Sequence, residues 1–333
     1  LGPRHPVVGN ELLYASRQIR WYAPARALRL AAQAYDIMLA ATGPSSSSTN
    51  FAARQIAAAQ LVLGQIEQSR ETSQRALLVG RALAEQSPLE AGYVLEQLVD
   101  IADAQDDRPS ALHWREEQLA HYRGSASFGP AHEKTLAAGW DVRIRYEAAG
   151  MFDKALAMDA WLGQAYAARG GPESGDALGV QVASARVLWR TGRRGEAEAH
   201  LEPWSRALAS AATPWTQSLA AWLRAQWARE DGREKEARAH MEEALAHAQA
   251  GDLSAGWGLI YVMAAGHCFL DGDLETSARR YEAGAGVVND GHAYLREFAL
   301  APYQPRASDD AVTAEVRRLR RHELSVRLSL SQD

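Results

Sequence analysis

Apolar residues recur every three or four positions along most of the chain, with polar and charged residues between them. The segments 177–190 and 196–209 show this pattern and are rich in alanine, leucine, arginine and glutamate, which favour helices. No segment shows the sustained alternation of β-branched and polar residues that is typical of a half-buried strand. The pattern therefore predicts an all-α protein.

Prolines recur along the chain at a nearly constant spacing. Six of the 12 prolines are separated from one another by 41 to 44 residues: Pro3, Pro44, Pro88, Pro130, Pro172 and Pro214. Glycine precedes four of them, at Gly2, Gly43, Gly129 and Gly171. Because glycine readily ends a helix and proline cannot continue one, these positions predict breaks between helical repeats.

A second set of turn signals lies about half a period away from the first. Four glycines are spaced by 40 to 42 residues: Gly150, Gly192, Gly232 and Gly272. Five residues after each comes a small residue, namely Ala155, Ala197, Ala237 and Ser277. Asp106 and Ala111 have the same spacing one unit earlier. A tight turn followed by a small residue lets two helices approach closely, so each unit is predicted to be a helical hairpin.

These residues resemble tetratricopeptide repeats of the longer, kinesin-light-chain-like variety with a period near 42. The start signature of that variety is matched at 1–6 (LGPRHP) and, apart from the last proline, at 128–133 (FGPAHE). Its turn is matched at 150–155 (GMFDKA), with Tyr146 at the preceding aromatic position. Arg143 departs from the pattern, because it stands where the family prefers a small residue.

The resemblance implies a right-handed α-solenoid of about seven hairpins with a C-terminal capping helix. It covers about residues 1–285, and we expect 286–333 to form an irregular segment followed by the cap. Because the chain begins with Leu1 inside repeat material, we expect it to be a piece of a longer polypeptide. In bacteria such repeats are commonly attached to an effector domain, such as a serine/threonine kinase or a transcription regulator.

Composition narrows the classes of partner. The net charge of −5 gives no overall attraction to nucleic acid or to an anionic membrane, and 47% hydrophobic residues argue against disorder. The single cysteine, Cys268, excludes an internal disulfide framework. No apolar run approaches the roughly 18 residues that cross a bilayer. We expect a cytoplasmic location, or a periplasmic one if a membrane anchor precedes the chain.

The family alignment also suggests which positions line a binding groove. The first helix of each hairpin lines the concave face, at 13, 10, 6 and 3 residues before the turn residue. The resulting candidates for partner binding are Tyr93, Glu96, Asp100, Trp140, Glu147, Arg186, Trp189, Trp222, Gln226 and Arg229. Tryptophan, tyrosine and arginine are common at binding hot spots, although tryptophans also fill gaps between hairpins. The acidic positions before Asp106 either attract a basic segment or form a solvated helix face.

Motifs for catalysis, metals and cofactors are missing from the sequence. His240 and His247 are seven residues apart, with Glu236 and Glu243 at helix-surface spacing, whereas helical zinc hydrolases place two histidines four apart. The serines after Gly43-Pro44 lack the lysine of a phosphate-binding loop, so they are predicted to be a polar linker that caps a helix beginning near Phe51. Cys268 is expected to be a buried thiol.

The last part of the chain is predicted to end in a helix that starts at Asp309-Asp310. Its inward stripe is expected to be Ala311, Val312, Val316 and Leu319. An alternative interpretation of this segment is that its four arginines, at 317–321, form a contact surface for phosphates or an acidic partner.

The sequence thus predicts a non-enzymatic scaffold or sensor region that binds a peptide segment of a protein partner, without a cofactor and without nucleic acid. An alternative is the regulatory region of a signalling enzyme, such as a kinase, whose catalytic domain precedes Leu1. A third interpretation is that the repeats drive self-association.

Overall fold

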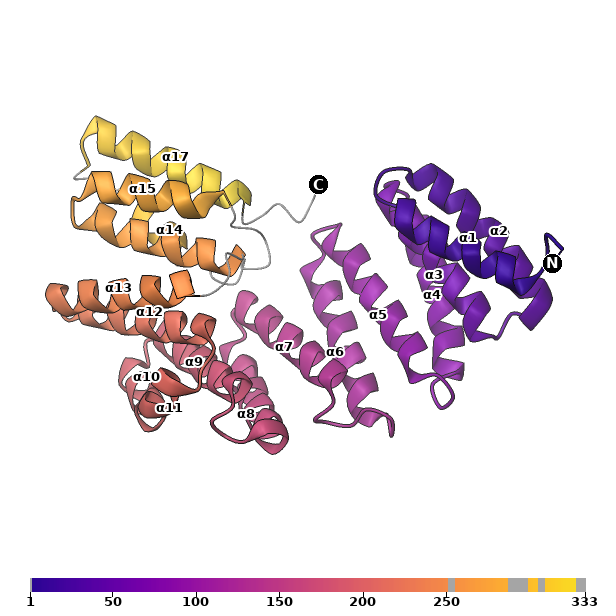
Figure 1. The fold of residues 1–333 in the computed structure, drawn as a ribbon, viewed down its shortest axis with the longest axis horizontal. Coiled ribbons are helices and arrows are strands. Elements are labelled where there is room, and N and C mark those ends of the chain that lie inside the picture. The colour runs from indigo at the N-terminus through magenta and orange to yellow at the C-terminus, as the bar shows by residue number, and fades with distance from the viewer. Residues whose placement is uncertain (1, 251–254, 287–298, 305–308, 328–333) are drawn as a thin grey trace. The chain divides into compact units, whose positions relative to one another are not determined.

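The computed structural model describes residues 2–250, 255–286, 299–304 and 309–327, and helices dominate it (Figure 1). Within these residues there is no β-strand. The first helices are α1 (Pro6–Ile19), α2 (Pro24–Thr42), α3 (Ser47–Val62), α4 (Ile66–Ala82), α5 (Pro88–Asp103), α6 (Arg108–Gly124), α7 (Glu133–Ala148) and α8 (Phe152–Gly170).

Shorter elements interrupt the series in the second half of the chain. The helices there are α9 (Gly175–Arg190), α10 (Arg194–Leu201), α11 (Ser205–Ser210), α12 (Pro214–Glu230), α13 (Glu234–Ala250), α14 (Ala255–Leu270), α15 (Leu274–Ala285) and α17 (Ala311–Arg327). The 3₁₀ turns η1 (Glu202–Trp204) and η3 (Ala301–Tyr303) complete the described elements.

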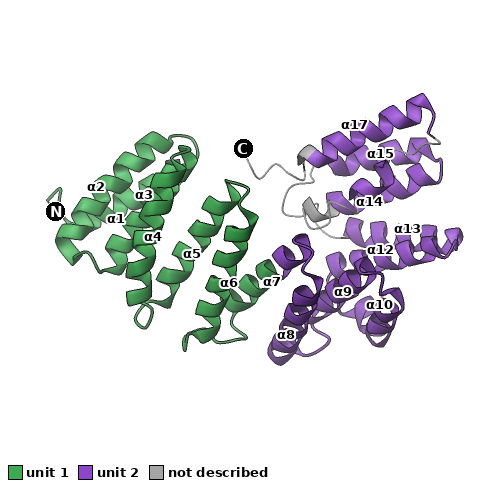
Figure 2. Ribbon diagram, turned by 180° about the vertical axis from the view of Figure 1, so that it is seen from behind, with its two compact units in different colours: residues 1–142 green, residues 143–333 purple. Residues whose placement is uncertain are grey.

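The chain forms two compact units, residues 1–142 and 143–333, with the boundary inside α7 (Figure 2). In each unit, consecutive helices pack as hairpins, and the second helix of one hairpin packs against the first helix of the next. The described residues contain seven hairpins, from α1–α2 to α14–α15. This arrangement confirms the predicted tetratricopeptide-like, all-α repeat fold.

The turns inside the hairpins lie where the glycine grid predicts them. Gly150, Gly192, Gly232 and Gly272 all have positive φ angles of 70° to 80°. Asp106, which takes the glycine's place in the third hairpin, has a φ of 52° and is the one non-glycine residue with positive φ in the described chain. These hairpins therefore share a left-handed residue at the turn, whether glycine or aspartate stands there, whereas the turn between α1 and α2 contains none.

The small residues that follow these turns are fully buried. Ala111, Ala155, Ala197, Ala237 and Ser277 all have no exposed surface. Ser277 also donates its hydroxyl hydrogen to the backbone oxygen of Ala265 on the partner helix (2.9 Å). A larger side chain here would push the two helices of a hairpin apart.

Two predicted helix boundaries are wrong for local reasons. The expected helix 196–209 is interrupted by η1, because Pro203 cannot continue the hydrogen-bonding pattern of α10. The helix expected near Phe51 begins at Ser47, where the hydroxyl of Ser46 accepts a hydrogen bond from the backbone nitrogen of Thr49 (3.1 Å). The serines therefore belong to the cap and first turn of α3 rather than to a linker.

The predicted capping helix is confirmed as α17, which begins after Asp310, whose carboxylate accepts from the backbone nitrogen of Thr313 (2.7 Å). The predicted inward stripe is wrong, because Ala311, Val312 and Leu319 are exposed and only Val316 is partly buried. The inward side chains are Val316, Arg317, Arg320 and Leu324.

Two arginines of α17 form its inner face. Arg317 lies on the ring of Phe269 (4.7 Å) and donates to the backbone oxygen of Pro302. Arg320 lies 4.7 Å from the ring of Tyr281 and donates to Ser277 (2.8 Å). These residues of the basic stretch therefore attach the cap to the last hairpin. The expected irregular segment from 286 onward lies largely outside the described residues.

Candidate partner-binding surfaces

Side chains of neighbouring hairpins contact one another at the repeat period. In the N-terminal unit, the amide nitrogen of Gln97 donates to the backbone oxygen of Arg54, 43 residues earlier (3.0 Å). In the C-terminal unit, the indole nitrogen of Trp189 donates to Glu230, 41 residues later (2.9 Å). The first helices of adjacent hairpins are thus aligned nearly in register, which brings equivalent positions together.

The N-terminal unit carries a column of alternating cations and aromatic rings on α3, α5 and α7. The guanidinium of Arg54 lies between Phe51 and Tyr93, at 5.1 and 4.9 Å from their ring centroids. The ammonium of Lys134 lies 5.6 Å from the ring centroid of Tyr93. Phe51 and Arg54 stand 13 and 10 residues before the turn residue Gly64. They therefore occupy predicted groove positions, as Tyr93 does before Asp106, although they are not among the predicted binding residues.

Two carboxylates extend this column along α5. Tyr93, Glu96 and Asp100 are three and four residues apart, which places them on one side of the helix. Tyr93 is partly buried, and Glu96 and Asp100 are exposed. The three residues predicted for this unit are therefore brought together on one accessible face.

The carboxyl group of Asp100 is a weaker acid than an ordinary aspartate, although part of its surface is open to solvent. Surrounding side chains desolvate it, and Glu96 and Asp103 repel its charge, so the pKa of Asp100 is raised to about 6. Arg115 and Arg20 oppose this shift. Part of the acidic charge on this face is thus sensitive to pH in the near-neutral range.

Near the start of the C-terminal unit, five charged residues form a buried cluster. Arg143 donates to Asp159 (2.8 Å) and to Glu147, and also to the backbone oxygen of Ala183 (3.1 Å). Glu147 further accepts from Arg186 (2.6 Å) and from Arg190 (3.1 Å).

Opposite effects act on the two carboxylates of this cluster. Burial raises the pKa of Asp159, and its neighbour Arg143 offsets this only in part. For Glu147, burial is outweighed by three arginines, so its pKa is lowered. Glu147 is therefore an ionised carboxylate inside the protein, and its charge is matched by its partners.

This cluster corrects two of the predicted binding residues. Glu147 and Arg186 are almost fully buried, so neither offers its charge to a partner. The cluster also explains the departure at Arg143, which fills the space of a small residue and needs Glu147 and Asp159 to neutralise it. The sequence showed the unusual arginine but not its partner 16 residues away.

The three predicted tryptophan anchors differ in exposure. Trp222 is 1% exposed, and its ring packs edge-on against Trp189 with 5.8 Å between the centroids. Trp222 is therefore a core residue rather than an anchor, because the neighbouring hairpin covers it. Trp140 and Trp189 are partly buried, and their role in partner binding stays a prediction.

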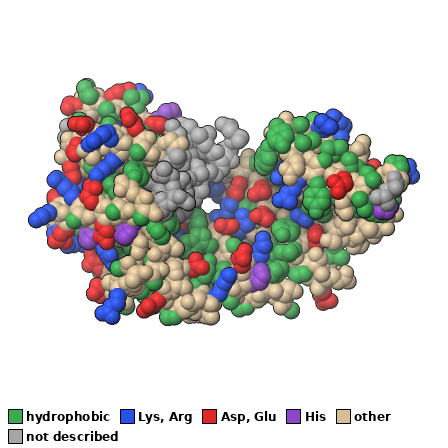
Figure 3. Space-filling model, viewed as in Figure 1, with side chains coloured by type: hydrophobic (Ala, Val, Ile, Leu, Met, Phe, Trp, Pro, Cys, Tyr) green, Lys and Arg blue, Asp and Glu red, His purple; other side chains and the backbone are tan. Residues whose placement is uncertain are grey.

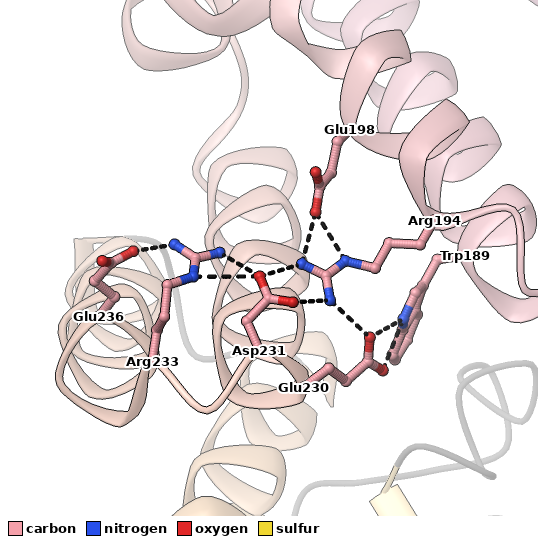
Figure 4. Close-up of polar contacts among 7 residues, drawn as sticks. All are labelled: Trp189, Arg194, Glu198, Glu230, Asp231, Arg233 and Glu236. Atoms are coloured by element: carbon pink, nitrogen blue, oxygen red, sulfur yellow. Dashed lines mark hydrogen bonds and ion pairs between the residues drawn. The ribbon is translucent and has the colours of Figure 1, made fainter.

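Around Trp189, an ionic network joins two hairpin turns (Figure 4). Arg194 makes a two-pronged contact with Asp231, with both distances at 2.6 Å, and also binds Glu198. Hydrogen bonds from Arg194 and Arg233 lower the pKa of Asp231 to about 2. Acidic and basic side chains are interspersed over this unit, at the left in Figure 3, which matches a surface of local ion pairs.

Gln226 and Arg229 are both engaged with a buried histidine. The amide of Gln226 lies 2.6 Å from Nε2 of His267, and Nε of Arg229 donates to Nδ1 (3.2 Å). Arg229 also donates to Asp271 (2.8 Å). Burial, followed by the charge of Arg229, lowers the pKa of His267 to about 3, so this imidazole is neutral near pH 7.

The remaining candidates for chemistry have structural partners. Cys268 is half-buried rather than buried, and its sulfur accepts a hydrogen bond from Arg280 (3.2 Å). His240 pairs with Glu243 on the surface of α13 (3.1 Å). Within the described residues, no three histidine, cysteine or acidic side chains are grouped as metal ligands. Among the described helices, none has both the length and the apolarity to cross a bilayer.

Comparisons with known proteins give neighbours in structure alone. No protein-family model and no curated protein matches this chain. The TPR-like repeats of a kinesin light chain from Podosopora anserina align over 62% of this chain and 97% of theirs, with 19% identity and a TM-score of 0.48. BtubC (BKLC) from P. vanneervenii aligns over 92% of this chain and 95% of its own, with 12% identity and a TM-score of 0.42.

Proposed function

We propose that this chain is a non-enzymatic interaction scaffold that binds a peptide segment of a partner protein along the first helices of its hairpins. One observation carries the proposal. On α5, the partly buried ring of Tyr93 is followed on the same side by the exposed carboxylates of Glu96 and Asp100. A ring held by two cations, next to two open acidic groups, is suited to an apolar contact flanked by salt bridges.

The partner segment that fits this face is basic. Lysine or arginine side chains would pair with Glu96 and Asp100, while their aliphatic stems cover the ring of Tyr93. Such charges mainly accelerate encounter and select the partner, so binding is expected to weaken with added salt. Trp140, at the end of the N-terminal unit, lies outside this proposal. In the C-terminal unit, Trp189, Gln226 and Arg229 remain candidate contacts through the parts of their side chains that stay accessible.

The test uses fluorescence anisotropy of short labelled peptides, in basic, neutral and acidic sets of equal length. The intact chain should bind the basic set preferentially. The double variant Glu96→Gln/Asp100→Asn should lose about five- to thirtyfold in affinity for the basic set, because the two lost pairs, at about 0.5–1 kcal/mol each, together remove about 1–2 kcal/mol.

The matched control is Glu71→Gln/Glu85→Gln, which removes two exposed charges from the same unit at other positions. It should retain the affinity of the intact chain. Equal losses in both double variants would mean that overall charge, rather than the α5 face, attracts the peptide. No preference for basic peptides in the intact chain would reject the proposal.

A further inference from the structure

A cavity of about 480 Å³ lies between the last two hairpins of the described chain, and the proposed function does not use it. Its two walls are α13 and α15, the second helices of these hairpins, and α14, which lies between them in Figure 1, contributes Tyr261. Sites for small organic ligands typically have volumes of about 300–1,000 Å³. The cavity therefore has the size of a small-molecule site.

The charged groups that line this cavity leave one positive charge unmatched. Glu242 on α13 and Arg280 on α15 neutralise each other, because the guanidinium donates to the carboxylate (2.6 Å). The third charged residue, Arg279, donates to the hydroxyl oxygen of Thr276 (3.3 Å) and forms no ion pair within the described residues. One carboxylate and two guanidinium groups thus leave a single positive charge at Arg279.

The acidic group that acts on Arg279 from outside the cavity does not neutralise it. Asp273, the N-cap of α15, lies within electrostatic range of Arg279, but its carboxylate is engaged by the backbone nitrogen of Thr276 (3.1 Å). The side chain of Arg279 is exposed, so its guanidinium is accessible to an anion from solution. A guanidinium binds a carboxylate through two parallel hydrogen bonds.

Apolar surface lies beside this charge. Leu245 of α13 lines the cavity and is 5% exposed, and the ring of Tyr261 is partly buried. The exposed side chains of Ala246 and Ala283, one on each wall, are too short to fill the space between the helices. The cavity therefore combines a single unmatched guanidinium with an apolar surface of limited extent.

We propose that this cavity binds a small organic anion that has one carboxylate and an apolar body. The carboxylate pairs with Arg279, and the apolar body lies against Leu245, Ala283 and the ring of Tyr261. A single negative charge is expected, because Glu242 already neutralises Arg280 and would repel a second anionic group. Since the cavity is open to solvent and offers one charged contact, a ligand of about twelve heavy atoms is expected to bind with a dissociation constant of about 1 mM.

Ligand-observed nuclear magnetic resonance with 4-phenylbutyrate as the probe tests this site. The intact chain should bind the probe about fivefold more tightly than 4-phenylbutyramide, which lacks the charge, or acetate, which lacks the apolar body. Arg279→Gln should raise the dissociation constant for 4-phenylbutyrate about fivefold, to the value for the amide. Arg193→Gln is the matched control, because it removes an exposed arginine of the same unit and should leave the constant unchanged.

A variant that fills the cavity separates this site from a general attraction of anions. Ala283→Leu should weaken the binding of 4-phenylbutyrate at least fivefold, and the chain should stay folded because position 283 is exposed. Ala209→Leu, at another exposed alanine of the same unit, should bind as the intact chain does. Circular dichroism verifies that all variants keep their helicity. No binding of 4-phenylbutyrate, equal binding of the acid and its amide, or equal affinity of the intact chain and the two cavity variants would overturn the proposal.

Discussion

At the residue scale, the buried charges around Arg143 show how the fold accepts an unsuitable side chain. The repeat pattern predicts a small residue at position 143. The arginine is accommodated there because Glu147 and Asp159 bind its guanidinium. Such a cluster need not add stability relative to an apolar core. Removing one member, however, leaves a buried charge without its partner.

Glu147→Gln tests this dependence. The substitution leaves three arginines around a neutral amide, so we expect it to destabilise the C-terminal unit by about 3–5 kcal/mol. Urea unfolding followed by circular dichroism measures the change. Glu196→Gln, which breaks the fully exposed contact with Arg193, should have an effect close to experimental error. Similar urea midpoints for both variants would show that the buried arginines do not depend on the charge of Glu147.

Asp100 provides a prediction about pH. Its pKa in the folded chain, about 6, is above its ordinary value of 3.8, so between these values the folded state holds more protons than the unfolded state. Stability therefore decreases as pH rises through this window, and the ionised group is costly at pH 7. Asp100→Asn should raise the urea midpoint at pH 7 and change it little below pH 4.

The same group should make binding depend on pH. Affinity for basic peptides is expected to fall as pH drops from 7 to 5, because Asp100 takes up a proton and loses its charge. Asp100→Asn should bind more weakly at pH 7 and show a flatter profile. An unchanged pH profile in the variant would assign the titration to another group.

At the element scale, the hairpin turn is set by backbone geometry. Asp106 adopts the left-handed conformation that glycine adopts in other hairpins, and its carboxylate makes an exposed contact with Arg108 (3.1 Å). Asp106→Gly should therefore stabilise the N-terminal unit by about 0.5–1 kcal/mol in urea unfolding. Asp106→Val should destabilise it. If the valine variant were as stable as the glycine variant, the turn would not require positive φ.

Arg320 attaches the capping helix α17 to the last hairpin through several aromatic rings. Arg320 lies near the rings of Phe269, Tyr281 and Tyr303, at 5.7, 4.7 and 5.6 Å. We expect Arg320→Ala to cost about 2 kcal/mol and to accelerate amide hydrogen exchange in α17. The neighbouring Arg318→Ala removes an exposed arginine paired with Glu315 and should leave exchange unchanged. Slow exchange in the Arg320 variant would show that other contacts hold the cap.

At the scale of the whole molecule, the sequence predicts the fold better than the surface. Proline and glycine grids report the period directly, because helix breaks and tight turns accept few other residues. Which side of a helix stays exposed depends on the helices packed around it. A tryptophan can therefore be either a core residue or a surface residue at equivalent positions. Trp222 and Trp189 occupy predicted groove positions, yet the packing of their hairpins buries the first ring and only partly covers the second.

The α17 stripe illustrates the same limit. Apolar spacing favoured Val312 and Leu319 as inward residues, but the aromatic surface below the helix accommodates arginine side chains, and the helix is rotated accordingly. Stacking between a guanidinium and a ring leaves no apolar pattern in the sequence. The acidic face of α5 follows from the sequence, since its residues have helical spacing, and within the described part of the chain Glu96 and Asp100 are exposed.

The central claim is that a basic segment lies along the α5 face, and site-specific photo-crosslinking tests it most directly. A benzoylphenylalanine side chain replaces Tyr93 in one variant and Tyr22, an exposed tyrosine of the same unit, in another. With a labelled basic peptide, we expect covalent adducts at position 93 and almost none at position 22. Equal adducts at both positions, or binding without any adduct at position 93, would contradict the account.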